Sequence, residues 1–290
     1  MPSPIIDAHV HTWDFSKAAY TWLDGDTSIL NRNYLVEQME HERIQAGVTA
    51  GVLVQAANNV EDTAWMLQVA ERNSWIKGVV GWLPLEDSEA TQDHLSHAWV
   101  HNAYLKGARH LIHNEPDPAW LLQPGVLNSL AVLANHHLTY DLVGVNNAHL
   151  ETALEVMDKV PELRMVLDHL NQPPIAKKEQ FGRWGELMAA AARNPHCFVK
   201  ISGLGTASGN LTGWQKEDLV PYVAFVLEQF GVDRCFCGGD WPVSLLAGSY
   251  PQIWGAYRAI LGQLLNEQEQ AQVLYHNVVR FYQLSIPSPA

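Results

Sequence analysis

Residues 4–14 read PIIDAHVHTWD. The rest of the chain is compatible with two folds, and this stretch distinguishes between them. Its apolar start predicts a first strand near residues 4–10, buried on both faces as in parallel sheets. The strand runs into two histidines, His9 and His11, where a doubly wound nucleotide-binding sheet has a glycine-rich turn. The stretch therefore favours a barrel of parallel strands, and a doubly wound open sheet is the alternative.

Short apolar runs alternate with amphipathic stretches along the rest of the chain. We expect strands near residues 4–10, 49–55, 76–83, 105–112, 138–144, 163–169, 197–202 and 234–240. We expect helices near residues 34–46, 61–72, 89–101, 126–136, 148–158, 181–193, 217–230, 252–263 and 267–275. A strand followed by a helix, repeated eight times, predicts an α/β protein built as a (β/α)8 TIM barrel.

No low-complexity linker divides the chain, so residues 1–290 are expected to form one barrel domain, with a loose tail at 285–290. Polar stretches at 171–180 and 203–217 are expected to be long loops. Such loops at the carboxyl ends of barrel strands are where barrel enzymes build their sites.

The charge balance is acidic, with 18 Lys and Arg against 31 Asp and Glu and a formal net charge of −13. This argues against nucleic acid or an anionic membrane as the main partner and favours a small-molecule substrate. The start of the chain lacks a signal-peptide pattern, and no stretch is long and apolar enough to span a membrane. Three cysteines cannot form a disulfide framework, so we expect a cytoplasmic protein. The sequence is also compatible with a homo-oligomer.

Two histidines and one carboxylate carry the strongest chemical signal. His9 and His11 are two apart on the first strand and therefore face the same way. Asp240 ends the eighth strand, which lies beside the first when a barrel closes. Such a set can bind one transition metal such as zinc, and the carboxylate can activate water. Polar caps at the barrel mouth are the alternative.

Other polar side chains are expected at the same rim. Asp168 and His169 end the sixth strand, and because strand neighbours alternate, only one of them should face the lumen. Arg109 on the fourth strand can offer a planar fork to a carbonyl oxygen, or form a structural ion pair. Tyr140 on the fifth strand and Lys200 on the seventh are weaker candidates for substrate binding.

Two tryptophans flank the proposed site. Trp13 follows the histidine pair, and Trp241 follows Asp240. Aromatic faces beside polar catalytic groups suit the C–H face of a sugar ring. The other tryptophans are expected to serve packing.

Several blocks of sequence resemble the amidohydrolase superfamily. They are IIDAHVHTW, GVLVQAA, GVVGWLPLED, KGARHLIHNEPDPAWL, YDLVG, MVLDHLNQPPI, VKISGL, CGGDWPVSLL and NVVRFYQL, and they run from about Ile5 to Leu284. More narrowly, the blocks look like the amidohydrolase-2-type group, which includes lactonases acting on L-fuconolactone and L-rhamnonolactone. The resemblance implies a barrel lactonase.

The resemblance also implies roles for individual residues. Where a metal is used, its ligands would be His9, His11 and Asp240, with His169 as a further ligand or substrate contact. Arg109 would contact the substrate. Some members of this group work without metal, and there the eighth-strand aspartate acts as base while arginine and histidine polarise the carbonyl. No carbamylated-lysine pattern is present, so at most one metal is expected.

Two positions depart from the family pattern. Gln172 stands where the family commonly has lysine after the sixth strand, which can change specificity. Gly239 stands where serine is common, a mild change because the neighbouring Asp240 is retained.

The expected reaction is hydrolysis of a sugar lactone to the aldonic acid, with water activated by Asp240 and the oxyanion stabilised by Arg109, His169 or the metal. A metal-dependent decarboxylase of an aromatic or unsaturated acid is the alternative enzyme on this scaffold. A non-catalytic carbohydrate-binding barrel is the third hypothesis.

Overall fold

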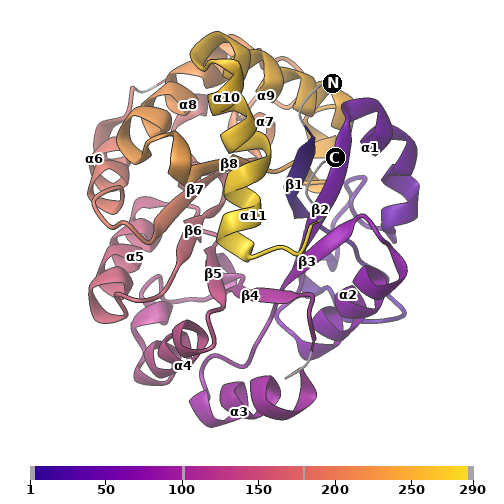
Figure 1. Cartoon of the computed structure of the whole chain (residues 1–290), viewed down its shortest axis with the longest axis vertical. Helices are drawn as coiled ribbons and strands as arrows, with labels where there is room; N and C mark the ends of the chain where they lie inside the picture. Colours follow the sequence, from indigo (N-terminus) through magenta and orange to yellow (C-terminus); the bar gives the residue numbers. More distant parts are fainter. Residues whose placement is uncertain (1–3, 100–101, 179, 287–290) are drawn as a thin grey trace.

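The computed structural model describes residues 4–99, 102–178 and 180–286. The eight strands are β1 (Ile5–Val10), β2 (Val48–Val54), β3 (Ile76–Gly81), β4 (Leu105–His110), β5 (Thr139–Leu142), β6 (Met165–Leu167), β7 (Cys197–Ile201) and β8 (Cys235–Cys237). Each strand pairs in parallel with the next one along the chain. Figure 1 shows these strands as a ring with helices around it, which confirms the predicted TIM barrel.

The ring closes between the first and last strands. Val10 forms a parallel bridge with Trp241. The backbone N–H of Asp240 donates to His9 O at 2.8 Å, and the N–H of His11 donates to Trp241 O at 2.7 Å. These bonds bring the end of β8 beside the end of β1, as expected for a closed barrel.

The helices follow the predicted order with three differences. They are α1 (Glu40–Ala46), α2 (Val60–Arg72), α3 (Ser88–Asp93), α4 (Pro124–Asn135), α5 (Asn147–Lys159), α6 (Gly182–Ala191), α7 (Leu204–Ala207), α8 (Lys216–Phe230), α9 (Tyr250–Leu264), α10 (Glu267–Ala271) and α11 (Asn277–Tyr282). The stretch expected as a loop at 203–217 contains α7. The helix expected near 34–46 begins with a 3-10 turn, Val36–Met39, and the last predicted helix continues through a wider turn into α11.

Some expectations reach beyond the described residues. The helix expected near 89–101 extends to 100 and 101, the loop at 171–180 includes 179, and the tail at 285–290 includes 287–290. These positions lie outside the part of the chain that the structure describes. Among the described residues, no helix is long and apolar enough to cross a membrane.

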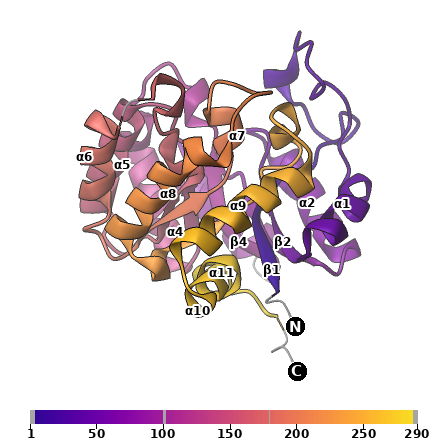
Figure 2. The ribbon, with the colours of Figure 1, turned by 90° about the horizontal axis from the view of Figure 1, so that it is seen from above.

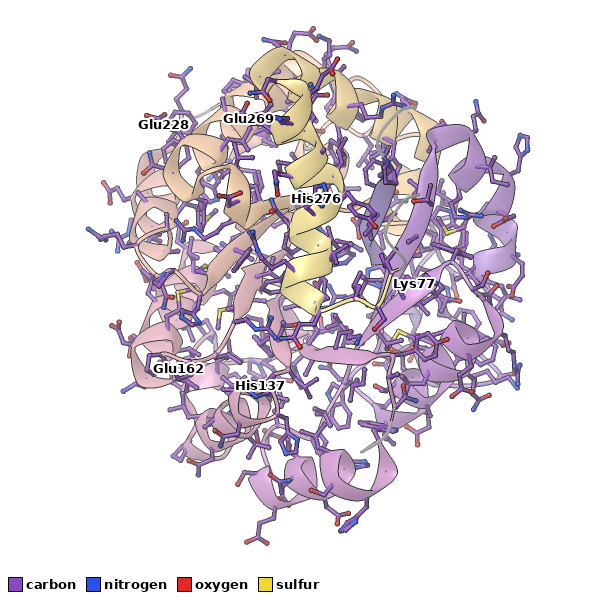
Figure 3. The ribbon with its side chains drawn as sticks, in the orientation of Figure 1. Lys77, His137, Glu162, Glu228, Glu269 and His276 are labelled. Atoms are coloured by element: carbon purple, nitrogen blue, oxygen red, sulfur yellow. The ribbon has the colours of Figure 1, made fainter. Side chains whose placement is uncertain are left out.

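The two ends of the barrel differ in chemistry. Ile6, Val52 and Phe236 form a buried apolar cluster with Phe281 of α11. Figure 2 shows α10 and α11 at one end of the barrel and the segment between β1 and α1 rising at the other. The exposed His276, labelled in Figure 3, lies on the face that carries α11. The apolar end is therefore closed, and polar chemistry is left to the opposite end.

Candidate active site

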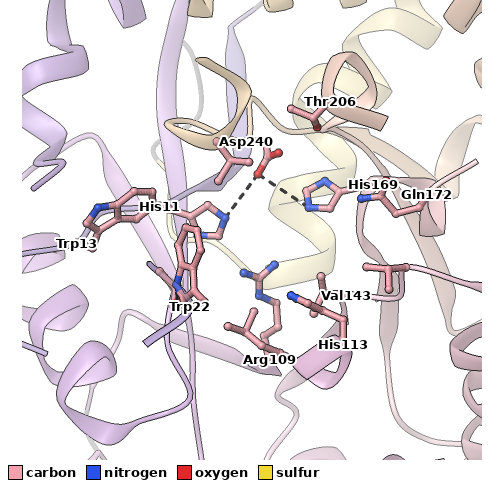
Figure 4. A pocket seen from close by; sticks show the side chains of 14 residues that line it. His11, Trp13, Trp22, Arg109, His113, Val143, His169, Gln172, Thr206 and Asp240 are labelled. Atoms are coloured by element: carbon pink, nitrogen blue, oxygen red, sulfur yellow. Dashed lines mark hydrogen bonds and ion pairs between the residues drawn. The ribbon is translucent and has the colours of Figure 1, made fainter. Parts of the chain in front are cut away.

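A pocket of about 220 Å³ opens at the carboxyl ends of the strands. Figure 4 shows Asp240 facing His11 and His169 across it, with Arg109 on another side. These four side chains come from the ends of β8, β1, β6 and β4. His9 lies just beneath them, fully buried. The barrel thus brings together the residues that the sequence pattern singled out for chemistry.

The spacing of His9, His11 and Asp240 fits a single metal ion. The two Nε2 atoms are 3.1 Å apart, and Asp240 Oδ1 lies 3.5 Å from His11 Nε2 and 3.7 Å from His9 Nε2. Tetrahedral zinc with bonds of about 2.1 Å holds its ligand atoms about 3.4 Å apart. The three side chains therefore form a candidate metal site.

The surroundings of the two imidazoles also suit a metal. His11 Nδ1 lies 2.8 Å from Val54 O, and since a carbonyl only accepts, Nδ1 donates and Nε2 keeps its lone pair. Burial lowers the pKa of His11, and it lowers the pKa of His9 well below the usual value. Both rings are therefore neutral near pH 7, which is the form that binds metals.

The turn after β6 directs two neighbouring side chains inward. The strand ends at Leu167, and the next residues form a 3-10 turn in which His169 has φ +55°. Asp168 reaches Arg109, and His169 reaches Ser202 Oγ at 2.8 Å through Nδ1. The expectation that only one of this pair faces the lumen is wrong, because strand alternation no longer applies after Leu167.

Asp240 has an equally unusual backbone. Its φ is +56°, a region that residues other than glycine seldom adopt and that recurs at functional sites. Gly203, with φ +60°, packs between Asp240 and His169 so closely that an added Cβ would lie 2.7 Å from His169 Nδ1 and 3.1 Å from Asp240 Oδ2. A glycine here lets the carboxylate and the imidazole share one side of the pocket.

Arg109 is held rigidly on three sides. Its Nε donates to Gln55 Oε1 at 3.1 Å, its Nη2 to Gln55 O at 2.7 Å and its Nη1 to Asp168 Oδ2 at 3.1 Å. The side chain is almost wholly buried and still lines the pocket. Such a fixed cation can stabilise developing negative charge without reorganising.

A cluster of buried charged residues, Lys200, Asp141 and Asp168, lies beneath the pocket. Lys200 Nζ is 2.7 Å from both Asp141 Oδ2 and Asp168 Oδ1, and 3.2 Å from His9 Nδ1. Tyr282 of α11 donates to Asp141 Oδ2 at 2.6 Å. Burial alone would raise the pKa of Asp168, but Lys200, His9 and Arg109 together outweigh it and hold that pKa well below the usual value. Asp168 is therefore an anion that fixes its cationic neighbours.

Three of the predicted substrate contacts do not line the pocket. Lys200 is fully buried within the cluster of charged residues beneath the pocket. Tyr140 packs in the core between strands and helices, and its hydroxyl has no hydrogen-bond partner among the described residues. Trp241 is buried, and its ring packs edge to face with the ring of Tyr34, with 5.4 Å between the ring centroids. Trp13 does line the pocket, as the sequence pattern indicated.

Sequence reasoning missed other residues of the pocket. Gln55, which anchors Arg109, is the first polar residue after an apolar strand, and that position was the available signal. His113 lines the pocket, and burial followed by the charge of Arg109 lowers its pKa to about 4. Trp22 also lines it and donates to Ala56 O at 2.7 Å, but no local pattern marks it.

Fold and site together define a barrel enzyme whose reactive groups are histidines, an arginine and a carboxylate at the carboxyl ends of its strands. The sequence model of the amidohydrolase family (Amidohydrolase, Amidohydro_2) matches residues 6–284. The chain therefore belongs to the amidohydrolase family, and the resemblance noted in its sequence is confirmed.

Relatives narrow this assignment. An L-fucono-1,5-lactonase from Burkholderia ambifaria is 32% identical over 287 residues, which cover 98% of this chain and 97% of that protein. An amidohydrolase from Burkholderia multivorans, whose crystal structure holds bound zinc, has a TM-score of 0.88 and 26% identity, and covers 98% of this chain and 100% of that one. A 2,6-dihydroxybenzoate decarboxylase from Rhizobium shares the fold, with a TM-score of 0.61 and 12% identity over 97% of this chain and 98% of that one.

Proposed function

We propose that this chain hydrolyses a sugar lactone of the L-fuconolactone or L-rhamnonolactone type to the aldonic acid. One observation carries the proposal. The carboxylate of Asp240 converges with histidines and Arg109 on one pocket, in a chain 32% identical to an L-fucono-1,5-lactonase over nearly its whole length. The transfer of an acyl group to water requires a carboxylate that acts as base, a fixed cation and a pocket for the substrate.

One divalent metal fits this pocket, and His9, His11 and Asp240 would hold it. When bound, such a metal supplies Lewis acidity toward the carbonyl and lowers the pKa of a coordinated water. Zinc suits the mixed nitrogen and oxygen donors. His169 Nε2 lies 3.9 Å from Asp240 Oδ1, at the edge of this group.

Asp240 is the proposed base. Its Oδ1 lies 3.5 to 3.9 Å from the imidazoles of His11, His9 and His169, and the residue lines the pocket. The carboxylate is thus open toward the pocket and can accept a proton from water attacking the lactone carbonyl. It then returns that proton to the leaving alkoxide as the ring opens.

Arg109 and the aromatic wall bind the substrate in this proposal. The guanidinium, fixed by Gln55 and Asp168, stabilises the oxyanion of the tetrahedral intermediate. His169 assists from the opposite side. Trp13 and Trp22 supply apolar faces for the C–H groups of the sugar.

His113 is a further proposed contact. With a pKa lowered to about 4, it is neutral at working pH and can exchange a hydrogen bond with a substrate hydroxyl. Gln172, which also lines the pocket, is proposed to set which hydroxyl pattern fits. Predicted substrate roles for Tyr140, Lys200 and Trp241 stay predictions, and their burial gives them no direct path to the pocket.

A panel of sugar lactones tests the function. We expect acid release, followed with a pH indicator, from L-fucono-1,5-lactone, L-rhamnono-γ-lactone or a stereoisomer. The panel is run with and without a chelator, beside elemental analysis of the purified protein. If no lactone is opened, the proposal fails. Release of CO₂ from a hydroxybenzoate instead would assign the chain to the decarboxylase alternative, which now rests on shared fold alone.

Cytoplasmic residence is part of the proposal, supported by the three cysteines. Cys197, Cys235 and Cys237 are all buried and free. Unpaired thiols are typical of reducing compartments. A single domain over 1–290 and a homo-oligomeric assembly stay predictions.

A further inference from the structure

The two ring nitrogens of His9 face different neighbours. Nε2 lies 3.1 Å from His11 Nε2, on the side of the pocket. Nδ1 lies 3.2 Å from Lys200 Nζ and 3.5 Å from Asp168 Oδ1, on the side of the buried charges. Since a neutral imidazole carries one proton, one nitrogen must donate while the other accepts.

Lys200 determines whether His9 Nδ1, on the side of the buried charges, donates or accepts. An ammonium group has three N–H donors and no acceptor. One of them is donated to Asp141 Oδ2 at 2.7 Å, and Asp168 Oδ1 forms an ion pair with the same ammonium at 2.7 Å. A further N–H has His9 Nδ1 within reach at 3.2 Å. His9 Nδ1 therefore accepts, and the imidazole proton is placed on Nε2.

The pocket side agrees with this assignment. His11 Nδ1 donates to Val54 O, so His11 Nε2 carries a lone pair. A proton on His9 Nε2 turns the 3.1 Å contact between the two rings into a hydrogen bond, whereas two lone pairs would repel. Arg109 Nη1 is also near His9 Nε2, but at 3.4 Å, and it makes its shorter bond to Asp168 at 3.1 Å.

A metal needs the opposite arrangement. Coordination through His9 Nε2 requires the lone pair there and moves the proton to Nδ1, where it would point at the Lys200 ammonium. Asp168 Oδ1, the acceptor available to that proton, is 3.5 Å away and forms an ion pair with Lys200. We propose that Lys200 weakens metal binding at this site by holding the proton of His9 on Nε2. The inference builds on the proposed ligand role of His9 and does not depend on the lactone.

The first test uses the wild-type protein without metal. Nitrogen-15 chemical shifts of labelled histidines distinguish the two neutral tautomers, and the His9 signal is assigned by its loss in His9→Gln. We expect the Nε2–H tautomer. An Nδ1–H tautomer in the metal-free wild type would overturn the proposal without any further variant.

The second test measures zinc affinity by competition with a chelator, without substrate. The double variant Lys200→Met with Asp141→Asn removes one buried positive and one buried negative charge, so the net charge near the site is unchanged. Asp168 then remains paired with Arg109 and is free to accept from His9 Nδ1. Because partners behind a ligating histidine change metal affinity by about 10- to 100-fold, we expect tighter zinc binding by that factor.

Asp141→Asn alone is the matched control, since it keeps the Lys200–His9 contact. We expect it to bind zinc no more tightly than the wild type and to keep the Nε2–H tautomer. A double variant whose zinc affinity is unchanged or weaker contradicts the proposal. So does a double variant whose His9 still carries its proton on Nε2.

Discussion

The backbone N–H of Asp240 donates to the backbone carbonyl of His9 across 2.8 Å. The proposed base and a proposed metal ligand are thus tied by one bond at the seam where the barrel closes. Their relative position depends on the sheet and hardly on the loops, which are the more mobile parts of most proteins. The same seam sets the 3.7 Å between Asp240 Oδ1 and His9 Nε2.

Asp240→Asn keeps the size of the side chain and removes the proton acceptor. We expect kcat for lactone hydrolysis to fall by about 10²- to 10⁴-fold, the usual contribution of general acid–base catalysis. Initial rates with a pH indicator measure this, and a thermal unfolding curve close to that of the wild type shows that the fold is intact. Retention of nearly full activity would rule out Asp240 as the base.

Arg109→Lys keeps the positive charge but loses the planar fork that Gln55 and Asp168 hold. We expect kcat to fall by about 10²- to 10³-fold, as for the loss of one oxyanion donor, with a smaller change in KM. Arg183→Lys is the matched control, because Arg183 is exposed and forms surface ion pairs with Glu151 and Glu186. Equal effects of the two substitutions would argue against an oxyanion role.

Gly203→Ala tests the close approach between His169 and Asp240. The added Cβ meets His169 Nδ1 at 2.7 Å, so we expect a large loss of kcat. Gly47→Ala is the control, since Gly47 has a similar φ of +78° but nothing within 4 Å of an added Cβ. Both variants should lose about 1–2 kcal/mol of unfolding free energy from left-handed backbone strain. Activity loss in Gly203→Ala no greater than in Gly47→Ala would show that the contact is unimportant.

Asp62→Asn tests a buried carboxylate that holds the loop after β2. Asp62 accepts from the backbone N–H groups of Ala56 and Ala57 and from the Tyr20 hydroxyl, and burial raises its pKa to about 6. The folded state thus binds this proton more tightly than the unfolded state, whose pKa is 3.8. The stability contributed by protonation is present below pH 4 and is lost as the pH rises through 6.

An asparagine at this position has no charge to bury. We expect the unfolding free energy of Asp62→Asn, relative to wild type, to rise by about 2–3 kcal/mol between pH 4 and pH 7, because most of a shift of about two pKa units at 1.36 kcal/mol each falls in this range. Urea unfolding at both pH values measures this difference. A difference that does not change with pH would contradict the assigned pKa.

The sequence allowed prediction of the barrel and of the group at its seam, because both follow from periodicity and from closure. Strand parity also places His9 and His11 on one face without knowledge of the loops. It failed at Asp168, because the strand ends at Leu167, two residues earlier than expected. Tyr140 was a candidate because it is polar, but its neighbour Asp141 is the one that meets Lys200 inside the barrel.

The depth of a side chain within the lumen is a second quantity that a linear pattern does not contain. Lys200 faces the interior as expected, yet it lies beneath the pocket and not in its lining. Trp22 enters the site through the course of a loop, which local pattern does not specify. Gln55 follows β2 directly, but its position in the sequence does not reveal its bond to Arg109. The roles assigned to all these residues stay predictions until the variants are measured.

The bond from Tyr282 to Asp141 has a consequence for biosynthesis. Tyr282 is the last residue of α11, whereas Asp141 lies near the middle of the chain on β5. A nascent polypeptide that has reached Val243 already contains every residue that lines the pocket but still lacks the hydroxyl that donates to Asp141. The buried charges can therefore reach their final arrangement only after the last helix has left the ribosome.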